Sequence, residues 1–204
     1  THEFATPEAL AQSRGLVASL LQDLDRDDEA EAAYLEGIHI NGGSARVARA
    51  FGVFRFRAGD FGGGQPYYAQ RLPELQRRRI PLENAAPRNL EGRTRVILMA
   101  EQGIGDQLAL MPLVRLAPID PARTELVMVG DPRFGPALEG NRLGLRHLPQ
   151  PEFIANPQRI DPAEMVYLGD LTRYLAGADP AAIQGAYLVP DVNRVNALRS
   201  AYQA

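Results

Sequence analysis

The sequence predicts two kinds of structure in one chain, an all-helical part followed by an α/β part. Three observations predict this class. Similar residues recur 34 positions apart in the first half, short apolar runs alternate with helical patterns in the second, and a segment with two prolines and no periodicity separates the halves. We expect helical repeats over residues 1–78, a linker over 79–94 and a parallel-sheet domain over 95–204. A length of 204 residues with 45% hydrophobic residues is sufficient for a buried core.

The helical part contains two similar segments, residues 16–38 and 52–72. Four residue pairs match at a spacing of 34: Ala18 with Gly52, Ala30 with Gly64, Tyr34 with Tyr68, and Ile38 with Leu72. Paired helices with this period resemble the tetratricopeptide repeat. The resemblance implies that Gly52 lies where two helices cross, that Gly59 lies in the turn, and that Tyr68 packs on the next unit. It assigns the packing positions to Ala18, Ala30, Tyr34, Gly52, Gly59, Gly64 and Tyr68.

The segments depart from the repeat consensus at several positions. Arg14 and Ala48 stand where the family usually has Trp, and Asp25 stands at the turn position that Gly59 holds in the second unit. A helical pair cannot bury its apolar face alone, so it must stack on a neighbour. Two interpretations stay open. The helices form a concave surface that binds a protein segment, or they only cap the domain that follows. An exposed stacking face also makes a homo-oligomer possible.

The composition excludes several chemistries. There is no Cys, which excludes thiolate nucleophiles and cysteine zinc sites. All 22 basic residues are Arg, which excludes a P-loop of the Walker type and a Schiff-base lysine. Four serines and three histidines, far apart in the sequence, make a hydrolytic triad a poor interpretation. The acidic run 23–28 resembles a calcium loop but lacks Gly at its sixth position and Glu at its twelfth, so we expect no metal site.

Charge and hydropathy exclude other partners. A formal net charge of −3 does not favour nucleic acid or an anionic membrane surface. No apolar segment approaches the roughly 18–20 residues of a membrane span, and the first residues show no signal-peptide pattern. We therefore expect a cytoplasmic protein with no membrane span.

The second half predicts a Rossmann-like parallel sheet, because short apolar runs alternate with helical segments. The expected strands are 95–100, 124–132, 143–149, 164–170 and 186–191. Helical spacing runs over 106–117, with a break expected at Pro112, and a short helix is expected within 132–140. Ligands of such sheets bind beyond the carboxyl ends of the strands.

Glycine and polar residues gather at these strand ends. They are Gly103, Gly105, Asp106, Asp131 and Asp170. A dinucleotide fingerprint requires a third glycine at position 108, where this chain has Leu108. Asp106, at the expected helix start, either caps the helix or accepts a proton from a ligand hydroxyl.

The segment LMAEQGIGDQLALMPLVRL (98–116) resembles the first strand, turn and helix of bacterial GT-B glycosyltransferases. It is similar to heptosyltransferases and to tetratricopeptide proteins that carry a domain like O-linked N-acetylglucosamine transferase. The order of repeats, linker and turn matches the second group. The resemblance implies the N-terminal half of a GT-B fold, which receives the acceptor, and it implies that Asp106 is the candidate base. It also implies that Glu101 and Gln102 flank the acceptor cleft, and that His147 either faces this cleft or has a structural role.

In this family a second domain holds the nucleotide-sugar donor. The resemblance places that domain beyond Ala204, so we expect this chain alone to be inactive and to bind no cofactor of its own. The expected partner is a protein acceptor on the repeat face. The alternative is a non-catalytic scaffold for protein–protein interaction, with a degenerate glycosyltransferase-like domain.

Overall fold

The computed structural model describes residues 6–40, 44–71, 89–156 and 164–202. The chain divides into two compact units, one within residues 1–83 and one within 84–204. Residues 79–88 of the expected linker lie outside the described residues.

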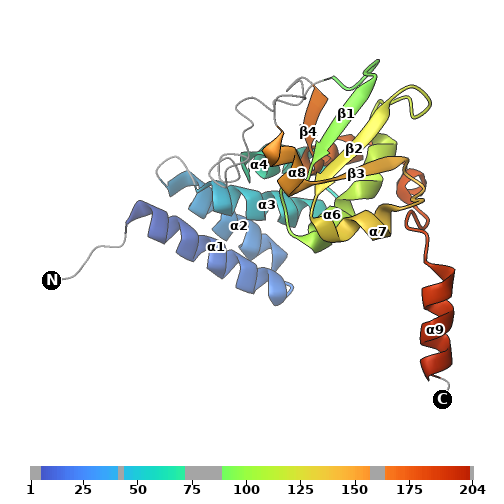
Figure 1. Cartoon of the computed structure of the whole chain (residues 1–204). Helices are drawn as coiled ribbons and strands as arrows, with labels where there is room; N and C mark the ends of the chain where they lie inside the picture. The colour runs from blue at the N-terminus through green and yellow to red at the C-terminus, as the bar shows by residue number, and fades with distance from the viewer. Residues whose placement is uncertain (1–5, 41–43, 72–88, 157–163, 203–204) are drawn as a thin grey trace. The chain divides into compact units, whose positions relative to one another are not determined.

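The first unit consists of helices, as the sequence predicts. They are α1 (Pro7–Asp23), α2 (Asp27–His39), α3 (Ala45–Arg57) and α4 (Phe61–Tyr68), followed by the 3-10 turn Ala69–Arg71 (Figure 1). Two helices begin at residues whose side chains cap them. Thr6 accepts a hydrogen bond from the Ala9 amide at 3.2 Å, and Asp60 accepts one from the Gly63 amide at 2.8 Å. Consecutive helices pack in pairs, α1 with α2 and α3 with α4.

The residues at the predicted packing positions of the helices are buried. They are Ala18, Ala30, Tyr34, Gly52, Gly64 and Tyr68. The ring of Tyr34 on α2 lies 5.8 Å from that of Phe51 and 5.6 Å from that of Phe54, both on α3. These aromatic contacts join the two helical pairs into one core.

The turns within the two pairs have the same backbone conformation at positions 34 residues apart. Gly59 has φ +80° and Asp25 has φ +56°, and Asp25 is the only described residue other than glycine with a positive φ. An L-residue pays a steric cost in this region that glycine does not.

Asp25→Gly is therefore expected to stabilise the protein, by about 0.5–1 kcal/mol, because it relieves this cost. Chemical denaturation followed by circular dichroism measures the change. The reverse substitution at the equivalent position, Gly59→Asp, is the control and is expected to destabilise. A destabilised Asp25→Gly variant would contradict the prediction.

The second unit contains a four-stranded parallel sheet in the order β3-β2-β1-β4. The strands are β1 (Arg95–Met99), β2 (Glu125–Gly130), β3 (Leu145–Pro149) and β4 (Met165–Tyr167). The parallel sheet and four of the five expected strands are thus confirmed. Because side chains alternate along a strand, one sheet face presents Val96, Leu98, Leu126, Met128, Leu145 and Val166 to a single core.

Helical segments contribute to this core. They include α6 (Ile104–Leu110), the 3-10 helix Met111–Leu116, the 3-10 turn Pro132–Phe134, α7 (Gly135–Leu138) and the 3-10 helix Leu168–Leu175. The change from α to 3-10 geometry beside Pro112 confirms the expected break, since proline cannot donate to the helix ladder. Among the described residues, two α-helices were not predicted, α8 (Gln150–Ala155) and α9 (Val192–Tyr202). The 3-10 helix Leu168–Leu175 was not predicted either, and its first three residues were expected to continue the fourth strand.

The prediction of a fifth strand over 186–191 is wrong. This segment contains no strand, and the apolar pair Tyr187 and Leu188 packs on the core of the unit instead. The Tyr187 hydroxyl donates to the Leu108 carbonyl at 2.7 Å, and the Arg142 amide donates to the Tyr187 carbonyl at 2.8 Å. A short apolar run has no periodicity that distinguishes a strand from an extended segment lying on a core.

Candidate functional site

The glycine turn connects β1 to α6 at the carboxyl edge of the sheet. The helix begins at Ile104 and its cap is Gly103, so the expectation that Asp106 caps the helix is wrong. Asp106 instead lies in the first helical turn, with its side chain exposed. A Cβ added to Gly105 would meet nothing within 4 Å, and Gly105 has no positive φ. The fold itself therefore does not require glycine at position 105.

Glu101 ties the end of β1 to the segment after β4. Its side chain is only 7% exposed, and its Oε1 accepts a hydrogen bond from the Gly169 amide at 3.0 Å. The adjacent residue, Asp170, is also buried. The structure thus brings Glu101 and the Asp170 segment together, in a packed position rather than on the surface.

Gln107 is a residue of this turn that the sequence analysis missed. It is buried, and its Nε2 donates to the Gln102 carbonyl at 2.7 Å, which holds the loop against its own helix. A Cβ on Gly130, at the end of β2, would lie 3.0 Å from the Gln107 Oε1. Gln107 follows Asp106 within an amphipathic segment, and nothing in that pattern indicates a buried amide.

Asp131 and His147 lie together at the next strand end. The Asp131 carboxylate accepts a hydrogen bond from the Arg133 amide at 2.9 Å, and its Oδ2 lies 2.8 Å from the Arg133 Nη2. The Nε2 of His147, on β3, lies 3.1 Å from the Asp131 carbonyl oxygen. In the tautomer protonated at Nε2, His147 donates to this carbonyl, so both residues make contacts that stabilise the loop.

The Arg133 side chain, with the Arg133 backbone amide, lowers the pKa of Asp131 from 3.8 to about 2. The ionised form of Asp131 therefore stabilises the fold above pH 4, and this stabilisation is lost as the pH falls from about 4 to about 2.

Arg133→Ala is expected to raise the pKa of Asp131 to a value between 2 and 3.8, since the backbone donor remains. Titration of the Asp131 carboxyl carbon by NMR measures the change. The control is Arg123→Ala, which removes an arginine paired with Asp120 and is expected to leave the pKa of Asp131 unchanged. An Asp131 pKa that stays at about 2 in Arg133→Ala would contradict the assigned cause.

Four carboxylates were expected at this edge, and their surroundings differ. Glu101 and Asp170 are buried, and Asp131 is held by Arg133. Asp106 alone among the four is exposed and has no side-chain hydrogen bond or ion pair to another described residue. It is the carboxylate at this edge that is available to an incoming group.

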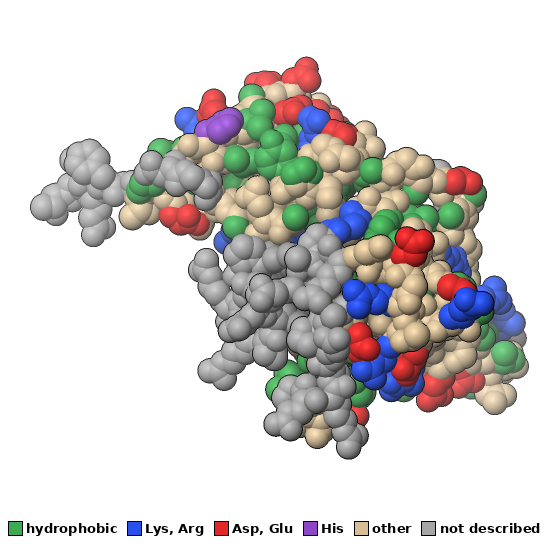
Figure 2. Space-filling model, turned by 90° about the horizontal axis from the view of Figure 1, so that it is seen from above, with side chains coloured by type: hydrophobic (Ala, Val, Ile, Leu, Met, Phe, Trp, Pro, Cys, Tyr) green, Lys and Arg blue, Asp and Glu red, His purple; other side chains and the backbone are tan. Residues whose placement is uncertain are grey.

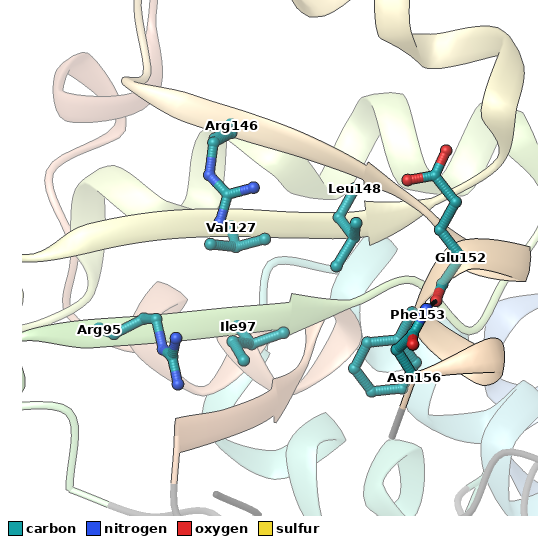
Figure 3. A pocket seen from close by; sticks show the side chains of 8 residues that line it. All are labelled: Arg95, Ile97, Val127, Arg146, Leu148, Glu152, Phe153 and Asn156. Atoms are coloured by element: carbon teal, nitrogen blue, oxygen red, sulfur yellow. Dashed lines mark hydrogen bonds between the residues drawn. The ribbon is translucent and has the colours of Figure 1, made fainter. Parts of the chain in front are cut away.

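A separate cavity of about 370 Å³ lies on the sheet face opposite the main core (Figure 3). Its lining consists of Arg95, Ile97, Val127, Arg146, Leu148, Glu152, Phe153 and Asn156, none of which was predicted as a site residue. The Nη2 atoms of Arg95 and Arg146 lie 2.5 Å and 2.8 Å from carboxylate oxygens of Glu164 and Glu125, respectively. Both arginines are thus charge-compensated. Pro151 and Glu152 are a helix-start signal for α8 that was overlooked.

In Figure 2, arginine and acidic side chains are interspersed, as the small net charge leads one to expect. Within the described residues, no helix has the length and apolar character needed to cross a membrane. The same residues contain no group of three or more His, Asp or Glu side chains placed to hold a metal ion.

Comparison with protein-family models, with curated proteins and with solved structures found no match to this chain.

Proposed function

We propose that this chain forms the acceptor side of a glycosyltransferase of the GT-B type, in which tetratricopeptide-like helices present a protein acceptor. The single observation that carries the proposal is the exposed carboxylate of Asp106 in a glycine turn at the carboxyl edge of a parallel sheet. The buried or paired state of the neighbouring acids supports Asp106 over Glu101, Asp131 and Asp170.

In the proposed reaction, the Asp106 carboxylate accepts the proton of an acceptor hydroxyl. The hydroxyl oxygen forms a bond to the anomeric carbon of a nucleotide sugar, and the bond from that carbon to the nucleotide diphosphate breaks. The donor is held by a second domain, so this chain contributes the base and the acceptor surface. The open space beside Gly105 leaves room for the acceptor at the turn.

The test measures sugar transfer by the complete natural protein, with a panel of labelled nucleotide sugars and unmodified cell proteins as acceptors. Asp106→Asn is expected to lower transfer about 100-fold or more, because it removes the base and preserves the shape. The matched control is Asp191→Asn, at another exposed aspartate, beside the start of α9. Equal transfer by Asp106→Asn and the wild type would refute the role of Asp106 as the base. If the wild type transfers no sugar to any acceptor, the proposed transferase activity is refuted.

A second variant separates function from folding. Gly105→Ala is expected to stabilise α6, since alanine favours a helix by up to about 1 kcal/mol and its Cβ meets nothing. If the acceptor lies against this turn, the same Cβ lowers transfer. A variant that is more stable and equally active would show that the acceptor does not approach Gly105.

A groove between α1 and α3 favours the alternative, a non-catalytic peptide-binding scaffold. Its volume is about 300 Å³, and it is lined by Gln12, Gly15, Leu16, Ser19, Arg46, Val47 and Ala50. An apolar lining with one arginine suits an extended peptide that carries an apolar and an acidic residue. Peptides selected from a random library should bind at least tenfold more weakly to Arg46→Glu and normally to Arg123→Glu. Failure to select any peptide would remove the support for this alternative.

A further inference from the structure

The short helix α6, which carries Asp106, is followed by a proline that leaves one of its carbonyls without a helical donor. In a continuous α-helix the Leu108 carbonyl accepts a hydrogen bond from the amide four residues later. That residue is Pro112, which has no N–H, and the preceding amide, of Met111, already donates to the Gln107 carbonyl. A partly buried carbonyl in this position needs a partner from elsewhere, because an unpaired backbone group away from water is costly.

The segment of residues 177–188, which we call the strap, supplies the donor that Pro112 lacks. Its Tyr187 hydroxyl lies 2.7 Å from the Leu108 carbonyl oxygen and donates to it, across 79 positions of the chain. Burial raises the pKa of the Tyr187 hydroxyl above its usual value of 10.0. Tyr187 therefore stays protonated, and able to donate, at neutral pH.

Further contacts hold Tyr187 in place. Its carbonyl accepts a hydrogen bond from the Arg142 amide at 2.8 Å, and the Arg115 Nη1 donates to the Gln184 carbonyl at 3.0 Å. The side chains of Tyr187 and Leu188 pack on the main core of the unit. The strap is thus anchored on both sides of Tyr187 along the chain.

We propose that Tyr187 is a positioning residue for the glycine turn, whose hydroxyl completes α6 and so holds Asp106 at the edge of the sheet. A helix of seven residues is too short to be stable by itself, so its geometry depends on tertiary bonds. Gln107 is bonded to the Gln102 carbonyl and Leu108 to the strap, and these two residues directly follow Asp106. The inference rests on the proposed function only in giving Asp106 the role of base.

Hydrogen exchange of backbone amides tests this arrangement without a substrate. Tyr187→Phe keeps the ring and removes only the donor, so the amides of residues 107–111 are expected to exchange about threefold to tenfold faster, and those of β2 at the same rate. The matched control is Tyr174→Phe, which is expected to change neither. Tyr174 packs on the same core, and within the described residues its hydroxyl makes no hydrogen bond to α6. Unchanged exchange in Tyr187→Phe would overturn the proposal.

A second substitution separates the loss of the donor from a loss of packing. Pro112→Ala places an amide four residues after Leu108, where it can donate to the same carbonyl. In the Pro112→Ala background, Tyr187→Phe is therefore expected to change the exchange of residues 107–111 by less than about twofold. An equal effect of Tyr187→Phe in both backgrounds would overturn the role of its hydroxyl.

Sugar transfer by the complete natural protein tests the link to Asp106. Tyr187→Phe is expected to lower kcat about threefold to tenfold with KM unchanged, because a displaced base slows the reaction of a bound acceptor without removing binding contacts. Adding Pro112→Ala is expected to restore kcat. Unchanged kcat together with faster exchange would overturn the positioning role. Absence of transfer by the wild type refutes the proposed function, and the exchange result then decides whether Tyr187 holds the turn.

Discussion

Replacing Gly52 by alanine is expected to lower the stability of the helical unit by about 3 kcal/mol or more. A Cβ at this position of α3 would lie 2.6 Å from the Tyr68 amide nitrogen and 2.9 Å from the Gly64 carbonyl oxygen. These are backbone atoms of α4, which cannot rotate away as a side chain does. Relief requires the two helices to separate, and that exposes the aromatic core they share. Helical circular dichroism during thermal and urea unfolding measures the loss.

The matched control is Gly62→Ala, ten residues along the chain on α4. A Cβ on Gly62 meets nothing within 4 Å, so alanine is expected to stabilise the helix by about 0.5–1 kcal/mol. The same substitution thus has opposite signs at two helical glycines. A Gly52→Ala protein as stable as the wild type would show that the helices do not cross as closely as the structure has them.

Replacing Asn141 by aspartate is expected to destabilise the second unit by about 3 kcal/mol. The Asn141 Nδ2 donates to the Leu138 carbonyl at 2.6 Å and to the Leu145 carbonyl at 2.7 Å. Its Oδ1 accepts hydrogen bonds from the Leu143 amide at 2.9 Å and the Leu145 amide at 3.1 Å. Aspartate keeps the accepting oxygen. It replaces the Nδ2 group, which donates both hydrogen bonds, with a carboxylate oxygen that faces the two carbonyl oxygens.

The control for this prediction is Asn196→Asp, on the exposed helix α9, which is expected to change stability by less than about 0.5 kcal/mol. Urea unfolding of the two variants compares the same chemical change in different surroundings. If Asn141→Asp were as stable as Asn196→Asp, the Asn141 side chain would not be what holds the turn before β3. The four hydrogen bonds also occupy both backbone groups of Leu145 at the start of β3.

Much of the fold followed from local patterns. The 34-residue spacing predicted helical pairs, and the turns at Asp25 and Gly59 share a left-handed backbone at that spacing. Apolar runs predicted β1 to β4 and a parallel sheet, because a strand buried on both faces reads as a continuous apolar segment. The segment 186–191 has the same local character, and its tertiary contacts with Leu108 and Arg142 distinguish it from a strand.

The sequence predicted where the candidate site lies but not the role of each of its residues. Strand ends meet at one edge of a parallel sheet, so the sequence alone located the glycine turn and its carboxylates. Their roles depended on hydrogen-bond and ion-pair partners that the strand pattern does not reveal. Glu101 is bound by an amide 68 residues away, and Asp131 is held by Arg133. Gln107 and Asn141 were missed because a side chain that satisfies backbone groups leaves no periodic signal in the sequence.

The sequence by itself determined the helical pairs of the first unit, the four strands of the parallel sheet and the chemistries that the missing residue types exclude, because these depend on residue type and on spacing along the chain. The tertiary structure alone decided which of four acids is exposed, why Gly52 cannot be replaced, and which side chain supplies the hydrogen bond that Pro112 cannot donate. These depend on atoms brought together from distant parts of each unit. Burial and hydrogen bonding are properties of those contacts and not of the residue alone.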